Sequence, residues 1–200
     1  MDRVAPDPRI ERTKDLIWKA LVDCVEEGGY DAATVSDICM NAGINRATLY
    51  RHYEDKDDAL RKGTARFIQR IIEQIEPYLG PVTAHSPETL AASIERVLLL
   101  MDSDRRTFQI MRGPTGPEEF STIAKDMLFE FLMDRLGSLT RSAVPDPCVQ
   151  EVTARMISAS LVEIAGWWIS GERGCPADTV AAAYASFVLA GSPYRPDGRG

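Results

Sequence analysis

Apolar residues recur at helical spacing along almost the whole 200-residue chain, and no segment alternates apolar and polar positions as a half-buried strand would. The first predicted helix ends at Gly28-Gly29, because glycine is a typical helix end signal. Its apolar positions are Leu16, Ile17, Ala20, Leu21, Cys24 and Val25. Prolines and glycines separate further helices, predicted over residues 56–79, 87–101, 105–112, 118–140, 147–170 and 176–190. The pattern predicts an all-α fold of about nine helices, followed by a loose tail over residues 191–200.

Two short helices separated by a four-residue turn are predicted between Thr34 and Lys56, written TVSDICMN, AGIN and RATLYRHY. Thr34 and Asp37 have the spacing of a capping box, so Val35, Ile38 and Cys39 should face inward. Gly43 supplies the backbone angle of a tight turn that Ile44 fills, and Asn45 is a good cap for the second helix. This is a helix-turn-helix signature.

The second of these helices has two distinct faces. Leu49 and Tyr53 are four residues apart and should pack inward, which places Ala47, Thr48 and Arg51 outward. In helix-turn-helix proteins the first residues of this helix meet base edges in the major groove. Arg46 could pair with guanine and Thr48 could reach a base or phosphate, while Tyr50, His52 and Lys56 would contact phosphates. Asp55 is the candidate cap of the helix that Lys56 begins.

The net charge of −7 argues against nucleic acid, because a basic surface normally attracts a protein to phosphate. Residues 1–62 contain 10 Lys and Arg against 13 Asp and Glu. From Ile38 to Tyr53, however, Arg46 and Arg51 meet no carboxylate. Positive potential is therefore confined to the second short helix, which predicts weak non-specific DNA binding and dependence on sequence-specific contacts.

The chain offers little to suggest catalysis, metal binding or a membrane span. Cys24, Cys39, Cys148 and Cys175 form no CxxC pair and are expected to be buried free thiols in a reducing compartment, the cytoplasm. His85, expected in a solvent-facing loop, belongs to no catalytic motif, and Arg105 and Arg106 should form a solvated helix junction with Asp102 and Asp104. No apolar run serves as a signal sequence or reaches the ~18 residues of a membrane span. We expect no enzyme, cofactor or metal.

The stretch LVDCVEEGGYDAATVSDICMNAGINRATLYRHYEDKDDAL resembles the DNA-binding domain of the TetR family of bacterial transcriptional regulators. The resemblance covers about a quarter of the chain and is carried by Gly29-Tyr30, Thr34-Val35, Ala42-Gly43-Ile44, Leu49-Tyr50 and Lys56. Tyr53 departs from the Phe that is frequent in the family, so its hydroxyl needs a partner or water. The resemblance implies an all-helical dimer that binds a palindromic operator and is released by a small ligand.

Carried over by position, the resemblance implies phosphate contacts for Thr34, Tyr50, His52 and Lys56 and base contacts for Arg46, Ala47 and Thr48. The full predicted DNA-contacting set is Thr34, Asn45, Arg46, Ala47, Thr48, Tyr50, Arg51, His52 and Lys56. The predicted division is a DNA-binding domain over 1–55, a ligand-binding and dimerisation domain over 56–190 and the tail over 191–200, with the helix from Lys56 connecting the domains.

The resemblance implies a homodimer through the last two long helices, about residues 147–190. Their small residues would permit close approach, with added apolar area from Trp167-Trp168; the small residues are Ala159, Ser160, Ala181, Ala182, Ala183, Ala185 and Ser186. The same residues could instead pack within one subunit. A ligand pocket in the C-terminal bundle would be lined by Phe67, Ile71, Met101, Phe108, Met111, Met127, Phe131 and Met156. These side chains could equally be plain core.

The function expected from the sequence is a ligand-responsive repressor that binds a double-stranded operator as a dimer and responds to an unidentified small molecule. The alternative is a helical adaptor that has kept the fold without binding DNA, which the acidic charge favours. A helical enzyme acting on a small molecule in its bundle is a further alternative, for which the sequence offers no catalytic candidate.

Overall fold

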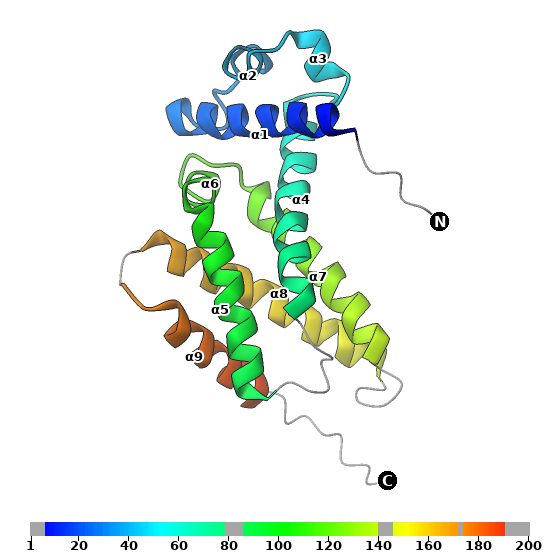
Figure 1. The fold of residues 1–200 in the computed structure, drawn as a ribbon, viewed down its shortest axis with the longest axis vertical. Helices are drawn as coiled ribbons and strands as arrows, with labels where there is room; N and C mark the ends of the chain where they lie inside the picture. The colour runs from blue at the N-terminus through cyan, green and yellow to red at the C-terminus, as the bar shows by residue number, and fades with distance from the viewer. Residues whose placement is uncertain (1–6, 79–85, 140–145, 172–173, 191–200) are drawn as a thin grey trace. The chain divides into compact units, whose positions relative to one another are not determined.

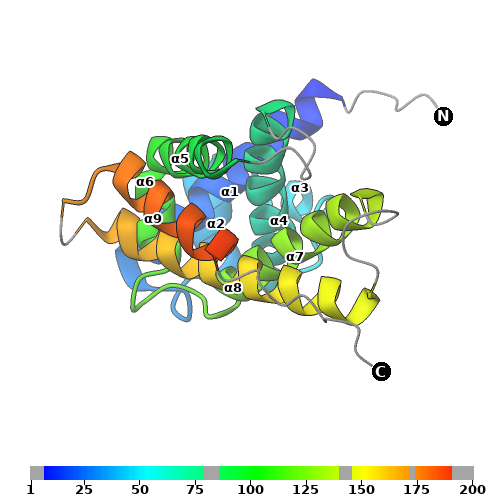
Figure 2. The same ribbon diagram turned by 90° about the horizontal axis from the view of Figure 1, so that it is seen from below.

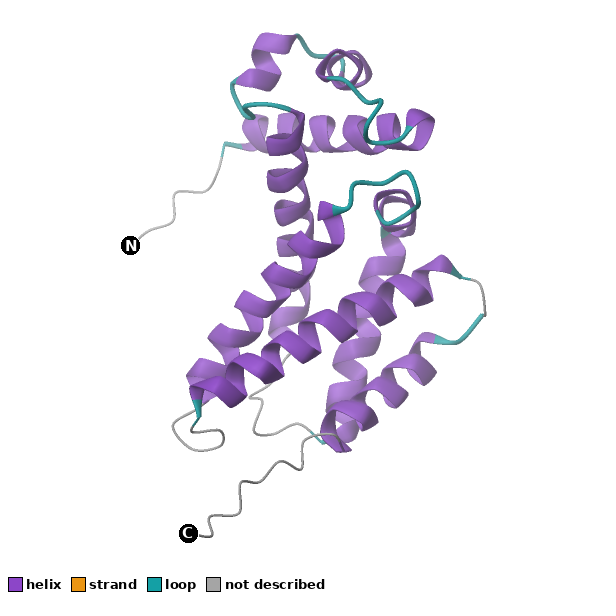
Figure 3. Cartoon of the chain, turned by 180° about the vertical axis from the view of Figure 1, so that it is seen from behind, coloured by secondary structure: helices purple, strands orange, loops and turns teal. Residues whose placement is uncertain are grey.

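The computed structural model describes residues 7–78, 86–139, 146–171 and 174–190, and in these ranges all regular structure is helical (Figure 3). Within the described residues, nine α-helices and one 3₁₀ turn follow one another as α1 (Pro8–Gly28), α2 (Val35–Ala42), α3 (Arg46–Tyr50), α4 (Lys56–Ile75), η1 (Glu76–Tyr78), α5 (Pro87–Ser103), α6 (Arg105–Met111), α7 (Glu119–Leu139), α8 (Pro147–Ser170) and α9 (Ala177–Ala190). The predicted all-α class is confirmed. The positions predicted for His85 and the 191–200 tail lie outside the described residues.

Helix boundaries follow the local signals of the sequence closely. Asp7 caps α1 by accepting a hydrogen bond from the Arg9 amide at 2.9 Å, and Gly29 ends it with a φ of 83°. Asp55 caps α4, accepting from the amide of Asp58 at 2.7 Å. The prediction of one continuous helix from Lys56 to Leu79 was too long, because the α-helical hydrogen bonding ends at Ile75 and a 3₁₀ turn follows. Pro77 in that turn lacks the N–H that an α-helix would need.

The chain divides into two compact units whose boundaries do not follow chain order. Unit 1 combines residues up to Gln69 with Arg106–Ala124, and unit 2 combines Arg70–Arg105 with the residues from Lys125 onward. The divisions fall inside α4, at the start of α6 and inside α7. A segment far along the sequence therefore belongs to the same unit as the helix-turn-helix stretch.

The core of unit 1 is built on four aromatic rings, contributed in turn by α1, α4, α6 and α7. Trp18 stacks on Phe67 with 5.8 Å between centroids, Phe67 lies 5.0 Å from Phe108, and Phe108 meets Phe120 edge-on at 5.9 Å. All four rings are buried. Because such pairs add about 0.5–1.5 kcal/mol each beyond their buried area, this cluster ties residues 106–124 to α1 and α4.

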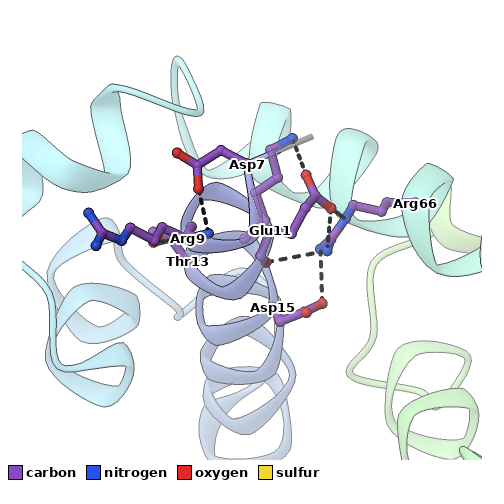
Figure 4. Close-up of polar contacts among 7 residues, drawn as sticks. Asp7, Arg9, Glu11, Thr13, Asp15 and Arg66 are labelled. Carbon is purple, nitrogen blue, oxygen red and sulfur yellow. Dashed lines mark hydrogen bonds and ion pairs between the residues drawn. The ribbon is translucent and has the colours of Figure 1, made fainter. Parts of the chain in front are cut away.

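An ionic clamp joins the N-terminal half of α1 to α4 within unit 1 (Figure 4). The Arg66 guanidinium on α4 bridges the Glu11 and Asp15 carboxylates of α1, at 2.7 and 2.9 Å, and also donates to the Glu11 carbonyl. Partial burial alone would raise the pKa of Glu11, but hydrogen bonds and positive charge from Lys14 and Arg66 outweigh it and leave the pKa lowered. Glu11 therefore stays ionised and holds α1 against α4.

Unit 2 is a bundle in which α9 lies alongside α5 and next to α8 (Figures 1 and 2). The buried face of α9 carries Val180, Ala181, Tyr184 and Ala185. The Tyr184 hydroxyl lies 2.7 Å from the Ser160 hydroxyl and donates to the Ile157 carbonyl at 3.1 Å, both on α8. The small residues predicted at these helices thus divide between an inner face and exposed positions such as Ala182 and Ala183.

Several burial predictions were wrong. Cys24 and Cys39 are buried as expected, but Cys148 is exposed and Cys175 is half-buried. Cys148 lies in the first turn of α8, out of phase with the buried positions of that helix, which are Gln150, Ala154, Ser158, Ala165 and Ile169. The burial of a cysteine depends on the side of the helix on which it lies, and Cys148 lies on the side that faces solvent.

The predicted junction of Arg105 and Arg106 with Asp102 and Asp104 was only partly right. Arg105 pairs with Asp102 at 2.5 Å, and both side chains are more than a third exposed. It also donates to the Ile169 carbonyl at the end of α8, at 2.7 Å. Arg106 points elsewhere and forms ion pairs with Asp23 and Glu26 of α1. Neighbouring residues on a helix diverge by about 100°, so the two arginines serve different units.

Candidate nucleic-acid interface

The first short helix, α2, is held at both ends by the predicted residues. The Thr34 hydroxyl accepts from the Asp37 amide at 3.3 Å, and the Asp37 carboxylate accepts from the Thr34 amide at 3.1 Å. Gly43 ends the helix in the left-handed conformation at φ 65°. Ile38 and Cys39 are buried, but Val35 is half-exposed rather than inward-facing. The capping box and the glycine turn are confirmed.

The second short helix, α3, is shorter than its sequence pattern predicts. It spans only Arg46–Tyr50, so His52 and Tyr53 lie in the turn that follows instead of on the helix. Leu49 is nevertheless fully buried, and the Tyr53 amide still donates to the Leu49 carbonyl at 3.0 Å, which keeps the Tyr53 ring 4% exposed. These two anchors leave Arg46, Ala47, Tyr50 and Arg51 exposed, as the two-faced pattern predicts.

A chain of hydrogen bonds orders the outward face of α3. The Asn45 side chain accepts from the Thr48 amide at 2.8 Å and from its hydroxyl at 3.0 Å. Arg51 donates to the Thr48 hydroxyl at 3.2 Å, and Arg46 donates to the Ser36 hydroxyl on α2. Sequence reasoning missed Ser36 because the contact spans the turn, although its place in the first turn of α2 is consistent with a position near α3. The polar face is therefore ordered before any partner is bound.

The Lys56 side chain is held by Tyr30, the aromatic residue of the Gly29-Tyr30 motif. Its ammonium donates to the Tyr30 carbonyl at 2.8 Å and lies 4.2 Å from the ring centroid. The Tyr30 hydroxyl donates to Asp57 at 2.6 Å. Partial burial and this hydrogen bond raise the pKa of Tyr30, so the hydroxyl keeps its proton. The sequence indicated Tyr30 as part of a motif but assigned it no task.

His52 lies beside two cations. Its pKa is lowered by partial burial and by the positive charges of Lys14 and Arg51. Since the usual value is about 6.5, the imidazole is neutral at pH 7. Lys14 is itself paired with Glu11 at 3.1 Å. The N-terminal half of α1 thus lies close to the residues that follow α3.

The eight residues predicted to line a ligand pocket are distributed over both units. Phe67, Phe108 and Met111 are buried in unit 1, and Ile71 and Met101 are buried in unit 2. Met127 and Phe131 of unit 2 are half-buried. Met156 is 62% exposed and so does not point into the interior. The contact between the Phe67 and Phe108 rings is part of the aromatic core of unit 1.

One face of α8 carries apolar side chains that no described part of the chain covers. Val152, Met156 and Trp167 are exposed by 50, 62 and 41%, and their spacing places them on the same side of the helix. Phe187 on α9 is 63% exposed. Among the described residues, no helix is both long and apolar enough to cross a membrane.

Comparison with known proteins places this geometry in context. Residues 17–61 match the model of a family described as bacterial regulatory proteins, tetR family. The chain is 27% identical to the transcriptional repressor BepR of Brucella suis, over 81% of this chain and 83% of BepR. It is 23% identical to the transcriptional activator FasR of Mycolicibacterium smegmatis, over 94% of this chain and 86% of FasR. The match to YxbF of Bacillus subtilis is 36% identical but spans only 34% of this chain and 18% of YxbF.

Solved structures share the fold. The fatty acid degradation regulator FadR of Bacillus halodurans superimposes with a TM-score of 0.64 at 19% identity, covering 97% of this chain and all of that chain. FadR of Bacillus subtilis in complex with stearoyl-CoA gives a TM-score of 0.59 at 19% identity, over 88% of this chain and 98% of that chain. With its helix-turn-helix geometry and the match over residues 17–61, this N-terminal part of the chain belongs to the tetR family of bacterial regulatory proteins.

Proposed function

We propose that this regulator binds a double-stranded operator through α3 and controls transcription from it. The observation that carries the proposal is the outward face of α3, where Arg46, Tyr50 and Arg51 are exposed while Leu49 and Tyr53 anchor the opposite side. A surface with arginines and no carboxylate, on a helix that follows a tight turn, suits the major groove. In this proposal, residues 1–55 bind DNA, and residues 56–190 bind the effector and form the dimer.

Each residue of the predicted DNA-contacting set has a proposed task. Arg46 pairs with guanine, Ala47 and Thr48 face bases, and Tyr50 and His52 bind phosphates. Thr34, at the start of α2, binds phosphate beside its capping role, as does Lys56 at the start of α4. Asn45 and Arg51 keep the face ordered and lie within reach of the duplex. These assignments rest on the exposure of the residues and on the family resemblance.

Gel retardation of an operator selected from random DNA fragments tests the proposal. Arg46→Ala and Tyr50→Ala should abolish retardation while the circular dichroism spectrum and elution volume stay those of the wild type. Lys19→Ala, which removes an exposed cation in the middle of α1, outside the predicted DNA-contacting set, is the matched control and should retain binding. Unchanged retardation by both α3 variants would remove the assignment of α3 as the reading helix.

The adaptor alternative remains the second candidate, because the net charge of −7 disfavours general attraction to DNA. The two proposals differ in one measurement. A salt-sensitive preference for one palindrome over scrambled DNA excludes the adaptor. Equal and weak binding to both duplexes would favour it.

We further propose that the protein is a homodimer formed through α8 and α9. The support is the apolar face of α8 with Phe187 of α9, which is exposed among the described residues. Two recognition helices about 34–36 Å apart would then meet successive half-sites of a palindrome. Sedimentation analysis should give a dimer for the wild type and a monomer for Met156→Glu with Phe187→Glu. Met40→Glu, 74% exposed on α2, is the control that adds charge elsewhere.

An apolar small molecule is the proposed effector. In unit 2, Ile71, Met101, Met127 and Phe131 provide apolar and adaptable side chains. A fatty acyl thioester is the first class to test, because FadR of Bacillus subtilis was solved with stearoyl-CoA. By linkage, an inducer must bind the DNA-incompetent arrangement more tightly than the DNA-bound one, and α4 contributes residues to both units. Stearoyl-CoA, but not coenzyme A, should raise the unfolding temperature and release the operator.

Repression is the proposed sign of regulation, since BepR is a repressor and aligns along most of this chain. Activation is the alternative outcome, because FasR is an activator. A reporter gene placed behind the selected operator separates the two. Expression should rise when the regulator gene is deleted, and a fall would reverse the assignment.

A further inference from the structure

We propose that Tyr30 is a positioning residue for DNA binding, which fixes the Lys56 ammonium for a phosphate and restrains the neighbouring Asp57 carboxylate by a hydrogen bond. This inference rests on the proposed function and deepens it. Tyr30 lies in the loop between α1 and α2, outside the recognition helix, so it acts through Lys56 and Asp57 rather than on the duplex. Three contacts of Tyr30 with the start of α4 carry the argument.

The first two contacts restrict Lys56. A lysine side chain is flexible, and ordering it costs rotamer entropy. In this protein the Tyr30 carbonyl accepts from the ammonium at 2.8 Å, and the Tyr30 ring lies 4.2 Å away. An ammonium has three N–H donors, so the carbonyl leaves others for a phosphate, and Lys56 is only half-buried. Tyr30 thus orders the Lys56 side chain during folding, so less entropy is lost when DNA binds, which is preorganisation.

The third contact concerns Asp57. This exposed carboxylate follows Lys56 directly and would repel the same phosphate. The Tyr30 hydroxyl donates to its Oδ1 atom at 2.6 Å. The hydrogen bond holds the carboxylate toward Tyr30 and offsets part of its negative charge. One side chain therefore orders the attractive charge and restrains the repulsive one.

Tyr30 is itself fixed from a distant part of the chain that belongs to the same unit. Its amide donates to the Thr115 carbonyl, in the loop between α6 and α7, at 2.9 Å. Beside it, a β-carbon on Gly29 would lie 3.3 Å from the Thr115 β-carbon, so the two loops are in close contact. This tether keeps the Tyr30 carbonyl and ring in place for Lys56.

The first experiment measures operator affinity against salt concentration for wild type, Tyr30→Leu, Lys56→Gln and the double variant. Each phosphate contact contributes about 0.9 to the slope of log K against log salt, so Lys56→Gln should reduce the slope by about 1 per subunit. Tyr30→Leu keeps the backbone carbonyl but removes the ring and the hydroxyl, so it should weaken binding by up to about tenfold, the upper range for one side chain that must be ordered on binding. In the Lys56→Gln background, the Tyr30→Leu change should lower the affinity less than it does in the wild type, because only the release of Asp57 remains, and it should not change the slope further. An equal additional loss in that background would overturn the proposal, because Tyr30 would then act independently of Lys56.

The second experiment isolates the hydroxyl and does not depend on whether Tyr30→Leu folds. Tyr30→Phe retains the ring and the carbonyl, so it should weaken operator binding with an unchanged Lys56 contact. Asp57→Asn added to Tyr30→Phe should restore the affinity, since the neutral amide no longer repels the phosphate. Failure of Asp57→Asn to restore binding would overturn the role of the hydroxyl. Absence of any wild-type complex would overturn the proposed function as well, whereas a wild-type complex unaffected by both Tyr30 variants overturns this inference alone.

Discussion

Gly63 on α4 faces the Trp18 ring on α1 so closely that a β-carbon built on it would lie 2.4 Å from Cε3 and 2.9 Å from Cζ3. Trp18 cannot easily move away, because it is buried and stacked on Phe67. The glycine is thus required by the packing of two helices and not by a turn. It allows α4 to approach α1 where the aromatic core of unit 1 begins.

Gly63→Ala should therefore destabilise the protein. In an exposed helix interior, replacing glycine with alanine stabilises by about 1 kcal/mol. Here the methyl group overpacks a rigid ring, and the free energy of unfolding should fall by about 1–3 kcal/mol in a denaturant titration. Gly28→Ala is the control, because its β-carbon would lie 3.7 Å from the Ala32 β-carbon, an ordinary contact. A Gly63→Ala protein at least as stable as wild type would contradict the close approach.

Gly43→Ala tests the turn between α2 and α3 by backbone strain alone. A β-carbon there meets no atom within 4 Å, but the residue has a φ of 65°. An alanine in the left-handed region should cost about 1–2 kcal/mol, and Gly43→Asn should cost less because asparagine tolerates that conformation. Thermal unfolding of the two variants provides the comparison. Equal losses from Ala and Asn would mean that something other than φ limits this position.

The Arg66 clamp should make stability sensitive to acid. The pKa of Glu11 is lowered in the folded protein, so its contribution is full above the unfolded pKa, about 4.3, and is lost as the pH falls through the folded pKa. Arg66→Met removes the cation and should flatten the dependence of stability on pH below about pH 4.5. The measurement is the unfolding midpoint at a series of pH values.

The control for the clamp is Arg155→Met, which breaks an exposed ion pair with Glu151 within α8. Pairs of this kind contribute about 0.3–0.5 kcal/mol, so its acid profile should match that of the wild type. If Arg66→Met also kept the wild-type profile, Glu11 would not be the group that titrates.

Operator affinity should rise as the pH falls from 7.5 to 5.5, because of His52. Its pKa is lowered in the free protein, so the ring is neutral at the upper pH, and a nearby phosphate would favour the protonated form. His52→Gln should show a smaller rise, measured by fluorescence anisotropy at constant ionic strength. His85→Gln, which changes the other histidine of the chain, should keep the wild-type profile. A wild-type pH dependence in His52→Gln would remove the phosphate contact assigned to this ring.

Local signals in the sequence were sufficient for the helices and for the reading face. The caps at Thr34, Asn45 and Asp55 involve partners three residues away, and the end of α2 at Gly43 involves partners three and four residues away. Leu49 and Tyr53 are four residues apart, so their burial follows from a single turn of backbone. The sequence pattern predicted a longer α3 because Leu49 and Tyr53 have helical spacing. The amides of Arg51 and Tyr53 do form helix-like hydrogen bonds, but the helix itself ends at Tyr50.

Contacts between distant segments could not be predicted in this way. Nothing near Tyr30 in the sequence indicates that it binds Lys56 and Thr115, and Arg106 gave no sign of pairing with α1. The predicted pocket set was chosen by residue type and helical spacing, which do not distinguish the core of unit 1 from the interior of unit 2. Cys148 and Met156 were misjudged for the same reason, since exposure depends on what packs against a helix.

The sequence by itself determined the all-helical class, the helix-turn-helix with its caps, and the face of α3 that meets solvent, because each depends on interactions within one or two helical turns. Only the tertiary structure decided that residues 106–124 join unit 1, that Gly63 must lack a side chain, and that Lys56 is ordered by Tyr30. Those features depend on surfaces brought together by folding, where shape and charge are matched between distant residues, from Tyr30 and Lys56, 26 positions apart, to Arg106 and Asp23, 83 positions apart.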